Sequence, residues 1–209
     1  VIDSPPCAMF STLQLNLNAK KMGKVEWEKR RRAAEVLLVF AAAVYKLQVL
    51  AGRHFLHEHL AGATSWNHPA IAKLLAMPGV NAVVAHQCAF GLQTSAQGGG
   101  QAPAMKPTRF MSSAPTVLEA LSRKCPGGHS HAPLLGGKRA SDAAVYPPGL
   151  CKAIAQGAAE QLRLDRASDE REMLPRRSGL HAVQGSREPL CREPRSTEVH
   201  CDEAQGRTK

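Results

Sequence analysis

The sequence predicts an α/β fold with a partly parallel sheet. Short apolar segments of strand length alternate with longer segments of helical character over the first 165 residues, and such alternation favours strand–helix–strand units. The 209 residues are enough for one domain with its own core. Apolar residues make up 44% of the chain and aromatic residues only 4%, so we expect a core built mainly from Ala, Leu and Val.

The expected elements follow one another in a simple order. Residues 1–7 are typical of the end of a strand that runs into a loop, and residues 93–103, rich in Gly, Gln and Ser, are expected to form a mobile loop. The other expected strands are 53–59, 80–85 and 107–113, the expected helices are 24–51, 68–77, 115–124 and 147–164, and 125–139 is a loop.

The longest expected helix, 24–51, has charged first turns and an apolar second half. Gly52 follows it, as glycine commonly follows a helix C-terminus. The most apolar run, 36–45, is ten residues long and is closed by Lys46. Since a helix that spans a bilayer needs about 20 apolar residues, we interpret this run as a buried helix and expect no membrane partner.

The pattern of the chain changes near Arg166. From there on, charges of both signs mix with Pro, Ser and Gly, and apolar periodicity is lost. We therefore expect two parts, a folded domain over residues 1–165 and a disordered polyampholyte tail over residues 166–209.

The net charge of +10 is concentrated in the first part of the chain. Residues 161–209 hold ten Lys/Arg and nine Asp/Glu, a net of +1, which leaves a net of +9 on residues 1–160. A basic excess on the folded part favours contact with the phosphates of DNA or RNA. The alternative is a basic soluble protein without a polyanionic partner.

The six cysteines show no paired spacing, and the sequence carries no secretory signal pattern. Both observations favour free thiols in a reducing compartment. We therefore expect an intracellular protein, nuclear if the host is a eukaryote.

The motif Ser4-Pro5-Pro6-Cys7 is the most informative stretch of the chain. Two prolines make a stiff, non-helical lead into Cys7, which suits a thiolate that must be aimed closely. With Phe10 and Ser11 following, the motif resembles the nucleophile loop of cytosine carbon-5 DNA methyltransferases. The resemblance implies a partial Rossmann-like methyltransferase core with a mixed sheet.

In that family the cysteine attacks carbon 6 of a flipped-out cytosine, and carbon 5 then takes a methyl group from S-adenosylmethionine. The resemblance therefore makes Cys7 the nucleophile. It also makes Ser4 and Pro6 contacts to the DNA substrate, with Pro6 at the cofactor pocket as well.

The second motif is His57-Glu58-His59 at the end of an expected strand. It resembles the family's Glu-Asn-Val or Glu-Asn-Pro motif, whose glutamate assists the attack at ring nitrogen 3 of cytosine as a general acid. The resemblance makes Glu58 catalytic. His59 stands where the family usually has Asn, so the resemblance does not show which residue orients Glu58. A metal site is the alternative for the two histidines, which share one face of a strand opposite Glu58, although the helical zincin spacing is missing.

A third region resembles the phage-type branch of the family: the turn Cys88-Ala89-Phe90-Gly91, followed by Lys106-Pro107-Thr108 and a strand. The resemblance makes Lys106 and Arg109 candidates for contact with phosphate or base. The alternative for either cation is a solvated surface charge.

The segment 143–154 resembles the helix that closes the methyltransferase core and lines the cofactor pocket, which makes Tyr146 a cofactor-binding candidate. In that family the glycine-rich turn and the acidic residue that bind S-adenosylmethionine precede the nucleophile loop. We therefore expect a fragment truncated before that loop, with the missing N-terminal half as its partner. Alone it would be inactive and would bind S-adenosylmethionine weakly or not at all.

The sequence leaves two further matters open. Cys125, His129 and His131 could bind zinc, with Cys151 or Cys88 as a fourth ligand, but we favour a polar loop without a metal. The alternative to a methyltransferase fragment is a non-catalytic, basic nucleic-acid-binding domain of a mobile-element polyprotein, with a polyprotein neighbour as partner.

Overall fold

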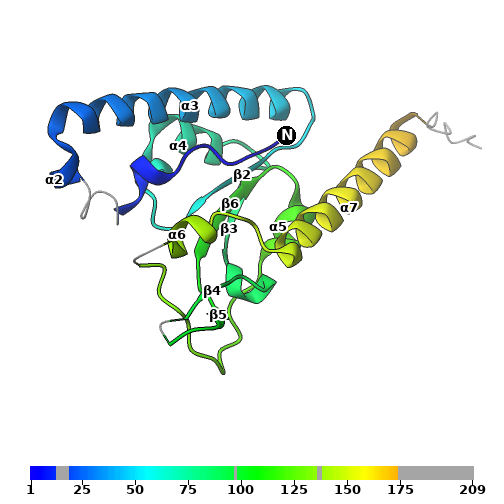
Figure 1. Cartoon of the computed structure of the whole chain (residues 1–209). Helices are drawn as coiled ribbons and strands as arrows, with labels where there is room; N and C mark the ends of the chain where they lie inside the picture. Colours follow the sequence, from blue (N-terminus) through cyan, green and yellow to red (C-terminus); the bar gives the residue numbers. More distant parts are fainter. Residues whose placement is uncertain (13–18, 97, 136–137, 174–209) are drawn as a thin grey trace, which may run out of the picture. The chain divides into compact units, whose positions relative to one another are not determined.

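A computed structural model describes residues 1–12, 19–96, 98–135 and 138–173 (Figure 1). In chain order its elements are β1 (Ile2–Asp3), η1 (Ala8–Phe10), α2 (Ala19–Met22), α3 (Lys24–Leu50), β2 (Leu56–Leu60), η2 (Thr64–Asn67), α4 (Pro69–Leu75), β3 (Asn81–His86), η3 (Gln87–Phe90), β4 (Gln93–Ser95), β5 (Gln101–Pro103), β6 (Pro107–Ser112), α5 (Pro115–Leu121), α6 (Arg139–Asp142) and α7 (Pro148–Met173).

The central sheet is mixed, with strand order β1-β2-β6-β3. β1 is parallel to β2, and β6 is antiparallel to both β2 and β3. The prediction of an α/β fold with a partly parallel sheet is therefore confirmed. This topology brings the carboxyl ends of β1, β2 and β3 and the amino end of β6 to one side of the sheet, which we call the carboxyl edge.

Helices α3 and α4 cover one face of the sheet (Figure 1). The aliphatic side chains Leu38 and Ile71 are fully buried there, together with Tyr45, whose ring stacks on Phe55 with centroids 4.7 Å apart. Met111 of β6 contributes to the same cluster. The predicted long helix and its glycine stop are confirmed, since α3 ends at Leu50 and Gly52 adopts a φ of +65°.

Helices α5 and α7 pack on the opposite face of the sheet. Phe110 of β6 and Leu150 of α7 are fully buried in this second cluster. The two helices approach closely at Gly157, where a Cβ atom would lie 2.7 Å from the Cα atom of Val117. The domain is thus a three-layer α/β/α arrangement.

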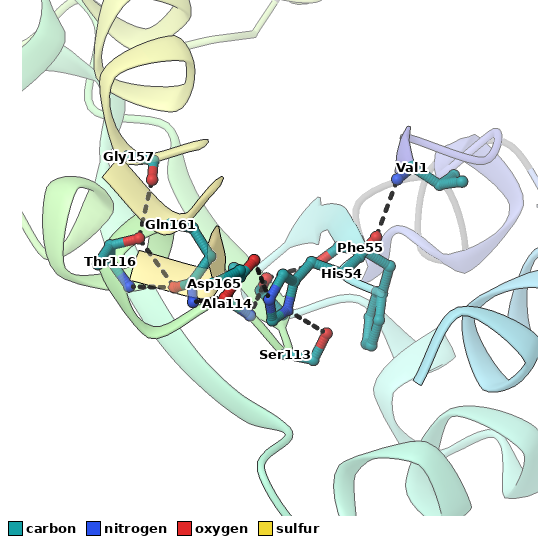
Figure 2. A network of polar contacts seen from close by, with 10 residues as sticks. Val1, His54, Phe55, Ser113, Ala114, Thr116, Gly157, Gln161 and Asp165 are labelled. Carbon is teal, nitrogen blue, oxygen red and sulfur yellow. Dashed lines mark hydrogen bonds and ion pairs between the residues drawn. The ribbon is translucent and has the colours of Figure 1, made fainter. Parts of the chain in front are cut away.

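A polar network joins α7 to α5 and β2, as Figure 2 shows. The side chain of His54 lies 3.1 Å from Asp165 through Nε2 and 3.2 Å from Ser113 through Nδ1. Gln161 donates to the second Asp165 oxygen and accepts from the Thr116 hydroxyl. These contacts fix the register of α7 against the rest of the domain.

Only one face of α3 is buried, which corrects the interpretation of residues 36–45 as a fully buried helix. Leu38 is 0% exposed, whereas Val36 and Phe40 are 67% and 66% exposed. By length and composition α3 could cross a membrane, with a mean hydropathy of 1.8 over its most apolar window, 28% of which is buried. The absence of a membrane partner stays a prediction.

The expected mobile loop at residues 93–103 is wrong. Strands β4 and β5 pair there as an antiparallel hairpin, with Thr94 opposite Ala102. The hairpin is anchored at its base by Leu92 and Ala104, which are buried against Ala143. The glycine-rich residues lie at the tip of the hairpin. The composition of the segment therefore does not reveal its two paired strands.

The last helix is longer than the sequence predicts. It was expected to end at Leu164, but α7 continues to Met173, so a disordered tail that begins at Arg166 is wrong for residues 166–173. These residues are mostly exposed. The rest of the expected tail, residues 174–209, lies outside the described residues.

Acid should destabilise this fold through His57. Burial, followed by the neighbouring His59, lowers the pKa of His57 to about 3 from 6.5, so the unfolded chain binds more protons below pH 6.5 and the free energy of unfolding falls as pH falls. We expect His57 to account for a loss of about 2 kcal/mol between pH 7.5 and pH 5. His57→Phe should remove that loss, as measured by urea unfolding at both pH values. Parallel pH profiles for the two proteins would contradict this assignment.

Candidate functional site

The loop that carries Cys7 lies beside Glu58 because β1 and β2 are parallel neighbours joined by α3. Ile2 pairs with Leu56 and Asp3 with His57, so the loop after β1 and the end of β2 meet at the carboxyl edge. Ligands of open α/β sheets commonly bind outside the carboxyl ends of the strands. The structure thus brings together the two predicted catalytic residues, Cys7 and Glu58, as the parallel pairing required.

His59 holds the loop that carries Cys7 to β2. Its Nε2 lies 2.8 Å from the carbonyl oxygen of Pro5, and its Nδ1 lies 2.6 Å from the hydroxyl of Ser65. A carbonyl oxygen only accepts, so Nε2 carries the proton and Nδ1 accepts from Ser65. The side chain is fully buried and burial lowers its pKa, which keeps it neutral. Local sequence does not reveal this contact, because Pro5 and His59 are 54 residues apart along the chain.

His57 lies on the same face of β2 as His59, and Glu58 lies on the other face, as the strand alternation predicts. His57 Nδ1 lies 3.2 Å from the hydroxyl of Tyr45, which also lies 3.2 Å from an Asp3 carboxylate oxygen. His57 Nε2 is buried without a hydrogen-bond partner among the described residues. The two imidazoles thus face different partners in an aromatic layer and do not converge as metal ligands.

Glu58 is 5% exposed and is surrounded by polar side chains. The Ser4 hydroxyl donates to its Oε2 at 2.5 Å. Tyr146 lies near both residues, and burial and then the Glu58 charge raise the pKa of its hydroxyl. Tyr146, expected in the cofactor pocket, is therefore a protonated neighbour of Glu58.

Cys7 is half-buried at the start of the η1 turn. Burial, and then the charge of Glu58, raise the pKa of its thiol, while the charge of Lys106 lowers it. Lys106 is held in place by a 3.1 Å hydrogen bond from Nζ to the carbonyl oxygen of Ala143. The site therefore combines Cys7, Glu58 and a cation, and keeps Cys7 a thiol at neutral pH.

Two of the predicted substrate contacts differ in their placement. Pro6 is exposed next to Cys7, where a ligand could reach it. Arg109 is separated from the site, because its pairing with His59 in the sheet puts it on the face opposite Glu58. Its guanidinium lies 4.6 Å from the centroid of the Trp66 ring. The structure therefore does not bring Arg109 together with Cys7 and Glu58, and its contact with phosphate or base stays a prediction.

An apolar cavity of about 500 Å³ lies far from these residues along the strands. Its walls come from the amino ends of β1 and β2 and from α5 and α7, and include Ile2, Val117 and Ile154. It is at the end of the parallel strands opposite to Cys7, so it is not the substrate pocket of this site.

A second cluster of chemically active side chains lies beside the carboxyl edge. It consists of Cys88 in η3 together with Cys125, His129 and His131, and we call it the Cys–His cluster. All four ligand atoms lie within 4.8 Å of one another. Of the two cysteines that the sequence offered as a fourth member, the structure brings in Cys88 and leaves Cys151 exposed in α7.

The basic turn of α3 is exposed but partly neutralised. Arg30 forms an ion pair with Glu26 at 2.7 Å, and Arg31 forms one with Glu35 at 3.0 Å. Both pairs link residues four apart on the helix. This arrangement favours a solvated helix face over a strong phosphate-binding patch at this turn.

Comparisons of the chain with protein-family models, curated proteins and solved structures found no match.

The charges around Cys7 should control its reactivity. Glu58→Gln removes the charge that raises the pKa of Cys7, so the thiolate fraction and the rate of alkylation by iodoacetamide at pH 8 should increase severalfold. Lys106→Met should lower the rate for the opposite reason. Peptide mass spectrometry gives the rate at Cys7, with the exposed Cys151 as internal reference. Rates that change in the same direction in both variants would contradict the geometry described above.

Proposed function

We propose that this chain is the nucleophile-bearing part of an enzyme that resembles a cytosine carbon-5 DNA methyltransferase. The observation that supports the proposal most strongly is the juxtaposition of Cys7 and Glu58 at the carboxyl edge, with Ser4 bound to Glu58. The order of the motifs along the chain agrees with it. The thiol of Cys7 and the carboxyl group of Glu58 would then face one ligand.

The chemistry assigned to this chain is the formation of a covalent adduct. The proton of the Cys7 thiol passes to the Glu58 carboxylate, and the thiolate adds to carbon 6 of a flipped cytosine, which forms an S–C bond and shifts the electron pair of the carbon 5–carbon 6 double bond to carbon 5 and on to nitrogen 3. Glu58 delivers the proton to nitrogen 3, neutralises the charge that develops there and becomes a carboxylate again. Lys106 favours the thiolate before attack, and Ser4 keeps the carboxyl group of Glu58 oriented.

S-adenosylmethionine would supply the methyl group to carbon 5, but the described residues do not fit this cofactor by themselves. Of the two candidates, Pro6 is an exposed loop residue and Tyr146 lies beside Glu58, whose charge raises the pKa of its hydroxyl after burial. The glycine-rich run 98–100 belongs to the tip of the β4–β5 hairpin, where it precedes no helix. We therefore assign no methyl-transfer step to the residues of this chain.

The surface of the domain supports a second polypeptide segment as partner. β1 is an edge strand of the sheet, and Ile2 is 61% exposed on it. The apolar cavity opens beside this edge, and the exposed apolar face of α3 includes Phe40 and Leu47. Open strand edges and contiguous apolar faces are usually covered. A segment that pairs with β1 and carries the cofactor site would cover them.

A basic, non-catalytic nucleic-acid-binding domain is the second candidate function. The net charge of +9 on residues 1–160 favours it. The ion pairs of Arg30 and Arg31 reduce the basic surface that was expected to contact DNA. This candidate requires neither Cys7 nor Glu58, so the covalent step distinguishes the two functions.

The covalent step can be tested with duplex DNA that contains 5-fluorocytosine. The chain is completed by the cofactor-binding half of an intact cytosine methyltransferase and supplied with S-adenosylmethionine. Fluorine blocks the final elimination, so we expect an adduct between Cys7 and the DNA that survives denaturing electrophoresis. Cys7→Ser should abolish the adduct, and Glu58→Gln should reduce its rate of formation at least 100-fold, in the range typical of general acid assistance.

Cys151→Ser is the matched control, because Cys151 is exposed and lies outside the site. It should leave the adduct intact. Equal trapping by the Cys7→Ser protein would exclude Cys7 as the nucleophile. DNA binding without an adduct, in a complex shown to bind S-adenosylmethionine, would favour the non-catalytic binding domain.

A further inference from the structure

We propose that the Cys–His cluster binds a structural zinc ion through Cys88, Cys125, His129 and His131. This proposal is independent of the proposed methyltransferase function, because none of the four residues belongs to the Cys7–Glu58 site. It revises the expectation from the sequence that the chain holds no metal.

The spacing of the four ligand atoms fits a tetrahedral ion. Zinc bonds of about 2.3 Å to sulfur and about 2.0–2.1 Å to nitrogen place neighbouring ligand atoms roughly 3.3–3.8 Å apart. The Cys125 Sγ lies 3.4 Å from Nε2 of both His129 and His131, and the two Nε2 atoms lie 3.0 Å apart. With Cys88 included, no pair exceeds 4.8 Å. Small adjustments of side-chain torsions would centre an ion among them.

The backbone around Cys125 presents its sulfur to the centre of the cluster. The Gly127 N–H donates to Cys125 Sγ at 3.4 Å, in a turn where Gly127 and Gly128 have φ values of +80° and +76°. Glycine is needed at both positions, because other residues rarely adopt such angles. An N–H group directed at the sulfur stabilises a thiolate, which is the form that binds zinc.

The end of β3 supports the cluster from outside. The Cys125 N–H donates to His86 Nδ1 at 3.1 Å, and the His86 N–H donates to the Arg123 carbonyl oxygen at 2.9 Å. These bonds attach the chain around Cys125 to the strand that leads directly into Cys88. Such outer contacts commonly orient metal ligands.

A metal explains this arrangement better than the other interactions open to these groups. Hydrogen bonding accounts for the contact between His129 and His131, since one Nε2 can donate to the other, but not for two sulfur atoms at the same point. A disulfide between Cys88 and Cys125 would leave the two histidines without a reason to converge. Two sulfur and two nitrogen ligands are typical of zinc, and four protein ligands leave no open position, as in structural sites.

The ion would close a long loop. Residues 122–135 form neither helix nor strand, and the three ligands within them would be fastened to Cys88 in η3. The backbone of η3 contacts the start of α7, where a Cβ on Gly149 would lie 2.4 Å from the Phe90 carbonyl oxygen. Zinc would therefore stabilise the loop and the packing at the start of α7.

Metal analysis of the whole chain, purified without a histidine tag from zinc-supplemented cells, tests the proposal. We expect one zinc per chain by mass spectrometry. Replacement by Co²⁺ should give the intense visible bands of a tetrahedral site and a thiolate charge-transfer band. Removal of zinc by a chelator should lower the midpoint of thermal unfolding by roughly 8–16 °C, as for a ligand present at about 1,000 times its Kd.

Variants decide which residues hold the metal. Cys125→Ser and His131→Asn should each bind no zinc, and their Co²⁺ charge-transfer band should be weaker or absent. Cys151→Ser should keep both the zinc and the band. Circular dichroism checks that the variants retain their helices. If folded Cys125→Ser still holds one zinc, or if the folded wild-type chain holds none and its thermal midpoint ignores added zinc, the proposal is wrong. A Cys88–Cys125 disulfide in protein kept under reducing conditions would also overturn it.

Discussion

The parallel pairing of β1 with β2 is the constraint on which the candidate site depends. The pairing involves only Ile2 and Asp3 in β1, too few residues to hold a loop by backbone bonds alone. Side chains reinforce it at three points: Tyr45 contacts Asp3, Ser4 donates to Glu58, and His59 donates to Pro5. Without this pairing, Cys7 would have no fixed relation to Glu58.

These contacts bury ionisable groups in their neutral forms, and this burial affects the protonation of the site. His57 and His59 are buried as neutral imidazoles, so the layer that positions the Cys7 loop resists protonation only while the domain stays folded. The thiol of Cys7 is likewise held above its usual pKa by burial and by Glu58. In the proposed reaction, the proton that leaves the thiol would neutralise Glu58 and so remove that obstacle to the thiolate.

Local pattern predicted most of the fold, and long-range contacts explain what it missed. The α3 helix and the strand around Glu58 followed from periodicity and from the glycine stop. The face of Arg109 depends on its register with β2, and the entry of Cys88 into the Cys–His cluster depends on the path of η3; neither is encoded in local spacing. Helix α7 continues past Arg166 through residues with good helix propensity and no apolar stripe, which periodicity does not detect. The roles of Cys7 and Glu58 stay predictions.

The hydrogen bond between His59 and Pro5 offers the most direct test that Cys7 is held against β2. Long-range ¹H–¹⁵N NMR of the imidazole nitrogens reports which one carries the proton. The account predicts a neutral His59 with its proton on Nε2, slow exchange of that proton with water, and a nuclear Overhauser effect from it to Pro5. A proton on Nδ1, or an Nε2 proton that exchanges rapidly and lies far from Pro5, would contradict it.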